Sequence, residues 1–174
     1  KKLIFLLFII VLGFTFILKE KDWKTEAIDP HVNAKAVLLI EAETGNVLYE
    51  KNSKESLPIA SMSKLMTQYL VLNAIQNGTI SWESTYEPSD EVQQLIGKAA
   101  ATKLGMTTGN TYSVQELFAA MTVNSANDAA MALAEMVSGT EEAFANLMNE
   151  QAREFKLKET TFYNASGLDG EYIG

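Results

Sequence analysis

The hydrophobic pattern divides the chain into an apolar N-terminal stretch, a polar connector and a longer mixed region. Lys1 and Lys2 precede an apolar run at residues 3–18. A basic start followed by an apolar run is typical of a signal peptide or signal anchor, although a bilayer-spanning helix needs about 20 residues. We therefore expect residues 1–18 to direct export, with cleavage left open, and residues 19–34 to form a charged linker.

Beyond the linker, the pattern predicts a β-hairpin followed by a helix. Apolar residues at 36–40 and 47–49 flank a turn-like stretch at 43–46. From residue 61 to 75, apolar residues return at helical spacing, and Asn77-Gly78 supplies a left-handed stop. The apolar positions expected on one side of this helix are Leu65, Met66, Tyr69, Leu72 and Ile75.

Further helical segments follow a mixed region at residues 80–112. Ser113 to Glu116 reads as a capping box, so a helix should begin there and the helical region should end at Gly139. A last helix is expected at residues 140–155. Its core-facing side chains are predicted to be Phe144, Leu147, Met148 and Phe155. The methionines of these segments are expected to fill the core.

Composition excludes several classes of function. The net charge is −8 and no basic stripe offsets it, which argues against nucleic-acid binding. The absence of cysteine excludes disulfides, thiolate catalysis and cysteine-ligated zinc. The single histidine, His31, lies in the predicted linker, so neither a Ser-His-Asp triad nor a histidine metal site is expected. We predict no metal and no cofactor.

Ser61-Met62-Ser63-Lys64 is an S-x-x-K motif at the predicted start of a helix. Residues i and i+3 share one helix face, about 5–6 Å apart at Cβ, so the lysine amine can reach the serine hydroxyl. Serine needs a base to become a nucleophile, and lysine is a base only when neutral. Burial and the positive end of a helix both favour the neutral amine. The motif by itself is short enough to arise by chance, in which case Ser61 only caps the helix.

Ser125-Ala126-Asn127 is the second candidate motif. It interrupts an apolar helical region with side chains that compete for backbone hydrogen bonds. Such local conflicts are common at functional sites. A polar loop between two short helices explains the same pattern, and the motif alone does not separate the two interpretations.

Taken together, residues 58–67 and 125–130 resemble the first two active-site motifs of the penicillin-recognising serine enzymes. Their order and spacing are similar to those of the D-alanyl-D-alanine carboxypeptidases. Three other stretches are similar to that family: the hairpin at residues 36–51, the helical segment at 112–134 and a loop at 160–169. The resemblance covers nearly everything after the linker.

The resemblance implies an α/β (α+β) fold of the β-lactamase/transpeptidase type, with an antiparallel sheet flanked by a helical subdomain. Residues 35–174 are then the N-terminal part of a catalytic domain. The family's third motif, Lys-Thr-Gly on a strand, is absent from the sequence. We expect that motif to lie beyond Gly174, and we expect this piece taken alone to be inactive.

The same resemblance implies a role for each motif residue. Ser61 attacks the penultimate D-alanine carbonyl and Lys64 accepts the serine proton. Ser125 passes a proton toward the leaving amine, and Asn127 holds the substrate amide or orients Lys64. The implied partners are peptidoglycan stem peptides ending in D-Ala-D-Ala, β-lactam antibiotics, and the membrane through the N-terminal segment. The implied location is the outer face of the cytoplasmic membrane or the cell wall.

Two other functions remain open from the sequence. A class A-like β-lactamase shares S-x-x-K, but usually has Ser-Asp-Asn where this chain has Ser125-Ala126-Asn127. A non-catalytic, membrane-anchored cell-wall binding module is the alternative from a different class. A carboxypeptidase is expected to hold a penicillin adduct for a long time, and a β-lactamase is expected to hydrolyse it rapidly. A binding module is expected to form no adduct.

Overall fold

The computed structural model describes residues 30–97 and 102–168. The predicted leader at residues 1–18 and the linker up to residue 29 lie outside these ranges. Within the part described, no helix is both long and apolar enough to cross a bilayer. The chain forms two compact units, Lys1–Glu55 and Ser56–Gly174, and each is described by itself.

The first unit contains the predicted β-hairpin. Strands β1 (Val37–Ile40) and β2 (Val47–Lys51) pair antiparallel, with Leu39 opposite Tyr49 and a bulge before Ile40. The turn between them is held by the Glu41 carboxylate, which accepts hydrogen bonds from the backbone N–H groups of Glu43 and Thr44. These bonds lower the pKa of Glu41, the hydroxyl of Thr44 contributing most. The hairpin prediction is confirmed, with boundaries moved by one or two residues.

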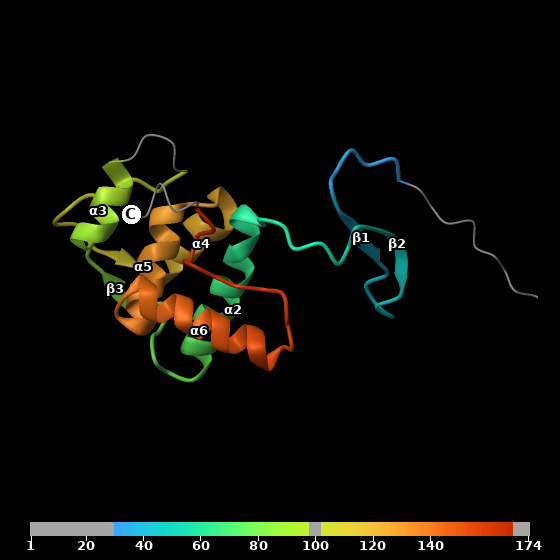
Figure 1. The fold of residues 1–174 in the computed structure, drawn as a ribbon. Coiled ribbons are helices and arrows are strands. Elements are labelled where there is room, and N and C mark those ends of the chain that lie inside the picture. The colour runs from blue at the N-terminus through green and yellow to red at the C-terminus, as the bar shows by residue number, and fades with distance from the viewer. Residues whose placement is uncertain (1–29, 98–101, 169–174) are drawn as a thin grey trace, which may run out of the picture. The chain divides into compact units, whose positions relative to one another are not determined.

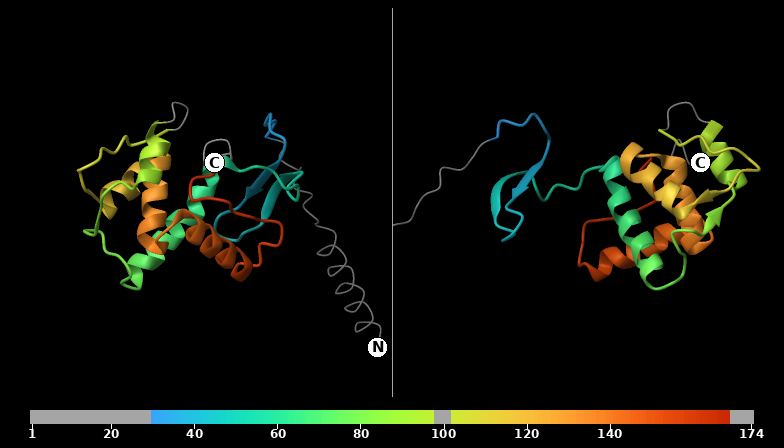
Figure 2. Two further views of the ribbon diagram at one scale, coloured as in Figure 1. Left: turned by 60° about the vertical axis from the view of Figure 1, so that its left-hand side comes forward. Right: turned by 180° about the vertical axis from the view of Figure 1, so that it is seen from behind.

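The second unit is a helical assembly with one small sheet. It begins with a 3₁₀ turn, η1 (Ala60–Ser63), which runs into α2 (Lys64–Gln76). The other elements are β3 (Thr85–Tyr86), α3 (Asp90–Gly97), β4 (Tyr112–Ser113), α4 (Val114–Asn124), α5 (Asn127–Ser138) and α6 (Glu141–Glu154). Helix α5 contacts α2, α3, α4 and α6, and the views in Figures 1 and 2 show it among them.

Local capping signals set several helix ends. Ser113 accepts from the N–H of Glu116, and the Glu116 carboxylate accepts from the N–H of Ser113, so the predicted capping box is confirmed. Thr140 caps α6 by accepting from the N–H of Ala143. Gly78, at φ +79°, lies two residues beyond Gln76, the last residue of α2, so the predicted stop is confirmed. Helix α3, within the region expected to be mixed, was not predicted.

The buried face of α2 differs from the one predicted. Its core side chains are Met66, Thr67, Leu70, Val71 and Ala74. Leu65, Tyr69 and Leu72 are 64%, 38% and 45% exposed, so the prediction that they share the buried side was wrong. The helix carries apolar residues around most of its circumference, so spacing alone does not select the face that packs.

The core of the second unit is formed by apolar side chains from α2, α4, α5 and α6. Phe144, Leu117, Met121, Leu133 and Met148 are completely buried. The expectation that methionines fill the core is confirmed for Met121 and Met148. Phe155 was expected inside but is 47% exposed, because it follows the end of α6 and lies edge-on against Tyr69, with ring centroids 5.1 Å apart.

Candidate active site

Ser61 was expected on the first turn of an α-helix. It lies instead on the 3₁₀ turn that precedes α2. The turn is entered through Ala60, whose φ of +46° is unusual for a residue with a side chain. Ser61 is exposed, whereas Ser63 and Lys64 are buried. The S-x-x-K motif therefore presents its first hydroxyl to solvent and directs its lysine into the protein.

Lys64 is 3% exposed and its amine touches three oxygen atoms. Nζ lies 3.2 Å from Ser61 Oγ, 2.7 Å from Asn127 Oδ1 and 2.8 Å from the Ser166 carbonyl oxygen. Among the described residues, no carboxylate pairs with it. Three elements thus meet at one nitrogen: the start of α2, the start of α5 and the segment after α6.

Burial lowers the pKa of Lys64 from its ordinary value of 10.5 to about 8. Burial is the cause of the shift, because removing a cation from water without a compensating anion destabilises its charged form. A base whose pKa lies near the working pH is best suited to proton transfer. The environment of Lys64 therefore favours acid–base chemistry at the adjacent hydroxyl.

The second motif lies at a break between two helices. Ser125 ends α4 in the left-handed conformation, with φ +56° and ψ +32°, and Asn127 begins α5. The interpretation as a loop between two helices therefore holds for the backbone, and the same break directs Asn127 at Lys64. Ser125 is half-buried, and its hydroxyl has no hydrogen bond to the residues described. The structure thus joins Ser61, Lys64 and Asn127 by hydrogen bonds, but not Ser125.

Asp128, next to Asn127, supports the motif from the other side. Its carboxylate is fully buried and accepts from the backbone N–H groups of Leu104 and Gly105, at 2.8 and 2.9 Å. The N–H of Asn127 donates to the carbonyl of Thr102 at 2.8 Å. The start of α5 is therefore fixed to the 102–105 segment.

The segment at residues 164–168 supplies a contact that the sequence interpretation missed. It returns from the end of α6 to the first turns of α2 (red in Figure 1), where the Ser166 carbonyl meets Lys64. One turn along α2, the hydroxyl of Thr67 donates to the Ala165 carbonyl at 2.7 Å. The available signal was the turn-forming composition of the stretch from Asn164 to Gly167, but a backbone acceptor has no residue signature.

Gly167 is required where this segment passes η1. Its φ is +78°, and a Cβ there would lie 1.9 Å from the carbonyl oxygen of Ala60 and 2.9 Å from Ser63 Oγ. Because only glycine meets both conditions without a clash, the approach of the 164–168 segment to the S-x-x-K turn depends on it.

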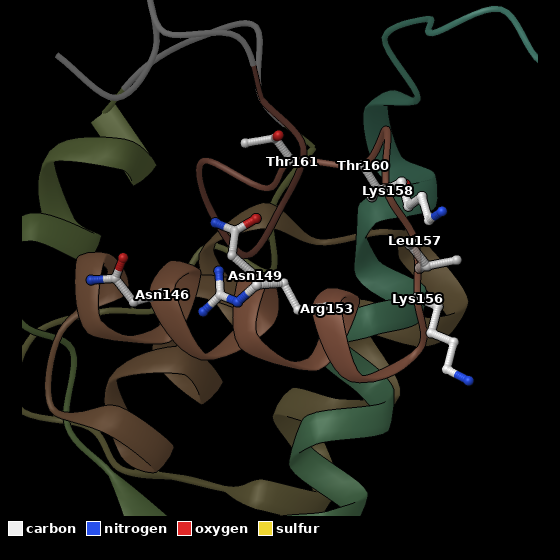
Figure 3. A pocket seen from close by; sticks show the side chains of 8 residues that line it. All are labelled: Asn146, Asn149, Arg153, Lys156, Leu157, Lys158, Thr160 and Thr161. Atoms are coloured by element: carbon white, nitrogen blue, oxygen red, sulfur yellow. The ribbon is translucent and has the colours of Figure 1, made fainter.

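A separate cavity of about 520 Å³ lies between α6 and the segment that follows it. Its lining includes Arg153, Lys156 and Lys158 but none of the motif residues. Figure 3 shows the Arg153 side chain pointing away from those of Lys156 and Lys158, so the three cations do not converge on one point. Within the described residues, no cluster of three or more histidine, aspartate or glutamate side chains could hold a metal.

Comparison with known sequences gives a consistent family. A profile described as D-alanyl-D-alanine carboxypeptidase matches residues 23–172. The chain is 39% identical over 138 residues to D-alanyl-D-alanine carboxypeptidase DacF of Bacillus subtilis. It is 34% identical over 142 residues to D-alanyl-D-alanine carboxypeptidase DacC of Escherichia coli. These matches cover 79% and 80% of this chain but 34% and 36% of the relatives, so the chain spans about a third of their length.

Solved structures show the corresponding fold. A peptidoglycan synthesis regulatory factor from Streptococcus pneumoniae superposes with a TM-score of 0.77 at 39% identity, over 81% of this chain and 39% of the other. A penicillin-binding protein from Listeria monocytogenes, in its ampicillin-bound form, gives 0.71 at 37% identity, over 83% and 56%. These matches confirm the expected transpeptidase-type fold, which here covers part of the length of each solved chain.

Proposed function

Because the chain belongs to the D-alanyl-D-alanine carboxypeptidase family, we propose that the intact protein removes the terminal D-alanine from peptidoglycan stem peptides, with Ser61 as its nucleophile. β-Lactams are proposed to acylate the same serine. The observation that carries this proposal is the Lys64 amine, which is buried, has no carboxylate partner among the described residues, and lies 3.2 Å from Ser61 Oγ.

The proposed acylation begins with transfer of the Ser61 proton to the neutral Lys64 amine. Ser61 Oγ then bonds to the carbonyl carbon of the penultimate D-alanine, and the C–N bond to the terminal D-alanine breaks. The leaving amine takes up a proton, which Ser125 relays from Lys64. The products are free D-alanine and an ester on Ser61, which water hydrolyses to regenerate the serine.

Asn127 is proposed to orient Lys64 during these steps, a role supported by its Oδ1, 2.7 Å from the amine. The proposed relay by Ser125 rests on the family motif and on its position two residues before Asn127. The backbone N–H of Ser61 is proposed as one oxyanion donor. Removing one such donor costs enzymes about 10²–10³ in rate.

The proposed substrate and location are supported by the relatives and by the N-terminal sequence. The relatives named above are D-alanyl-D-alanine carboxypeptidases, and the Listeria protein has been solved with ampicillin bound. The basic and apolar N-terminus at residues 1–18 supports export. We therefore place the proposed activity at the outer face of the cytoplasmic membrane or in the cell wall, on peptides ending in D-Ala-D-Ala.

The test is covalent labelling of the intact protein by a fluorescent penicillin. The wild-type protein should form a stable adduct, and Ser61→Ala should form none. Ser63→Ala is the matched control, because Ser63 lies in the same motif but is buried, and it should still be labelled. Undiminished labelling of Ser61→Ala excludes this nucleophile. Rapid loss of the wild-type label indicates a β-lactamase, and absence of any wild-type label indicates a non-catalytic binding module.

A further inference from the structure

The segment at residues 164–168 is organised around one buried side chain. Asn164 is 5% exposed, and its Oδ1 accepts from the backbone N–H groups of Ser166 and Gly167, at 3.1 and 2.6 Å. It also accepts from the Ser166 hydroxyl at 3.1 Å. Its Nδ2 donates to the Leu168 carbonyl at 2.9 Å. Both ends of the amide therefore tie the backbone of this segment into a closed turn.

That turn delivers a carbonyl group to the Lys64 amine. The Ser166 N–H binds Asn164, while the Ser166 carbonyl accepts from Lys64 Nζ at 2.8 Å. The turn is also anchored from outside, because Thr67 donates to the Ala165 carbonyl and Glu141 accepts from the Ala165 N–H at 3.2 Å. The position of the Ser166 carbonyl is thus fixed by the hydrogen bonds of Asn164 and by those that hold the N–H and carbonyl groups of Ala165.

The chemistry of the three oxygen atoms around the Lys64 amine gives the Ser166 carbonyl a directional effect. A neutral amine keeps two N–H groups and one lone pair. The Ser166 carbonyl and Asn127 Oδ1 only accept hydrogen bonds, so they take the two N–H groups. The lone pair is then left to the third neighbour, Ser61 Oγ, which has a proton to give.

We propose that Asn164 is a positioning residue for acylation, which acts by holding the Ser166 carbonyl against the Lys64 amine and so directs its lone pair at Ser61. This inference rests on the proposed function of Ser61 and Lys64. It assigns to Asn164 no contact with substrate. The Ser166 side chain is not used, because the contact is made by its backbone.

Two carboxylates on the helices around Lys64, those of Asp128 and Glu141, make their hydrogen bonds elsewhere. Asp128 on α5 binds the N–H groups of Leu104 and Gly105. Glu141 on α6 binds the Ala165 N–H, and burial raises its pKa. Neither carboxylate bonds to the lysine. A new negative charge introduced at position 164 is therefore a change that the Lys64 titration can report.

The experiment measures the rate constant and the final amount of penicillin labelling of the intact protein across pH. Asn164→Ala removes all the side-chain hydrogen bonds that Asn164 makes within the turn. It should slow acylation about 10²-fold at all pH values, which is a typical effect of misplacing a reacting group by about 1 Å. The final amount of label reports the folded fraction, so a slow rate with full labelling separates positioning from unfolding.

Two further variants sharpen the test. Asn164→Asp keeps an acceptor for the same N–H groups, so it should recover most of the rate at high pH, while its charge shifts the acid limb to higher pH. Asn149→Ala is the matched control. The Asn149 amide donates to the Phe162 carbonyl at 2.7 Å and accepts from the Phe162 N–H at 2.8 Å, so it ties α6 to the residue two positions before Asn164. This control should label at the wild-type rate.

Three results overturn the inference: a wild-type rate in Asn164→Ala, an Asn164→Asp variant as slow as Asn164→Ala at every pH, or an equal loss in Asn149→Ala. If Asn164→Ala does not fold, the Asn164→Asp profile decides alone. Failure of the proposed function is distinguished from these results because it appears in the wild-type protein, which would then form no adduct dependent on Ser61.

Discussion

Two polar clusters in the helical unit are built from residues far apart in sequence, yet they differ in almost every physical respect. Around Glu135, the Tyr86 and Ser89 hydroxyls donate to the two carboxylate oxygens, at 2.5 and 2.9 Å. Around Lys64, the buried group is a cation, and its hydrogen-bond partners in the part of the chain that the structure describes are neutral oxygens. In the first cluster, each carboxylate oxygen accepts a hydrogen bond from a hydroxyl group. In the second, burial destabilises the charged form of the lysine.

The two clusters also differ in their backbone conformations. Residues with positive φ lie in each segment of the Lys64 cluster: Ala60 before Ser61, Ser125 before Asn127, and Gly167 after Ser166. None of the three residues of the Glu135 cluster has a positive φ. Unfavourable backbone conformations persist where surrounding structure enforces them, often at functional sites. The Glu135 cluster therefore has the features of a network that stabilises the fold, and the Lys64 cluster has those expected of the proposed active site.

The largest expected effect is that of Lys64→Arg. Arginine keeps the positive charge but does not deprotonate, so acylation by penicillin should fall by about 10²–10⁴, the usual contribution of a general base. Stopped-flow or gel-based acylation kinetics on the intact protein measure this loss. Lys156→Arg, in the exposed segment after α6, is the matched control and should label normally. A near-normal rate in Lys64→Arg would show that the lysine is not the base.

Gly167→Ala should have the next largest effect. The new Cβ would lie 1.9 Å from the Ala60 carbonyl oxygen, and an alanine is strained at the native φ of +78°, so the segment must move away from η1. We expect acylation to slow by about 10²-fold, as for other misplaced catalytic groups. Gly109→Ala is the control, because its φ is +82° but nothing lies within 4 Å of its Cβ. It should lower stability by roughly 1–2 kcal/mol and leave acylation intact. Equal losses of acylation in Gly167→Ala and Gly109→Ala would show that the close contact with Ala60 is not the cause.

The third prediction uses pH to compare the clusters. With a Lys64 pKa of about 8, the neutral base is about a tenth of the protein at pH 7. The acylation rate should therefore rise by about tenfold per pH unit below 8 and level off above it. The pKa of Tyr86 is raised to about 12 by its burial and by its hydrogen bond to Glu135, so this tyrosine keeps its proton throughout this range. A rate independent of pH from 6 to 9 contradicts the role of Lys64.

The same shift has a consequence for stability. The pKa of Lys64 is lower in the folded protein than in the unfolded chain, so the unfolded state binds more protons between about pH 8 and 10.5. The contribution of Lys64 to stability therefore rises with pH in this window and is constant below it. Denaturant unfolding at several pH values, compared with the same series for Lys64→Met, isolates this contribution.

The smallest expected effect on catalysis is that of Glu135→Gln. The amide has one acceptor oxygen where two hydroxyls donate, so one of the two bonds is lost. We expect a loss of about 1–3 kcal/mol in unfolding free energy with an unchanged acylation rate constant for the folded protein. Glu142→Gln, on the exposed side of α6, should change neither quantity. Slower acylation in Glu135→Gln would mean that the two clusters are coupled.

Much of the fold follows from local sequence patterns. The hairpin, the capping box at Ser113, the stop at Gly78 and the last helix were predicted because each depends on residues only a few positions apart. The short helix α3 and the packed face of α2 were not predicted. Both depend on which apolar surface finds a partner, and an apolar pattern on most sides of α2 leaves that choice to packing.

For the candidate site, the sequence by itself determined the proximity of Ser61 and Lys64, because three positions separate them at the start of a helix. It also indicated Asn127 and Ser125 as candidates, through a motif that interrupts an apolar region and resembles the second motif of the family. Only the tertiary structure decided that Lys64 is buried, that Asn127 reaches it from α5, and that a carbonyl held by Asn164 completes its surroundings. The physical reason is that desolvation and backbone carbonyls belong to no single residue type, so they arise only when segments far apart in the chain pack together.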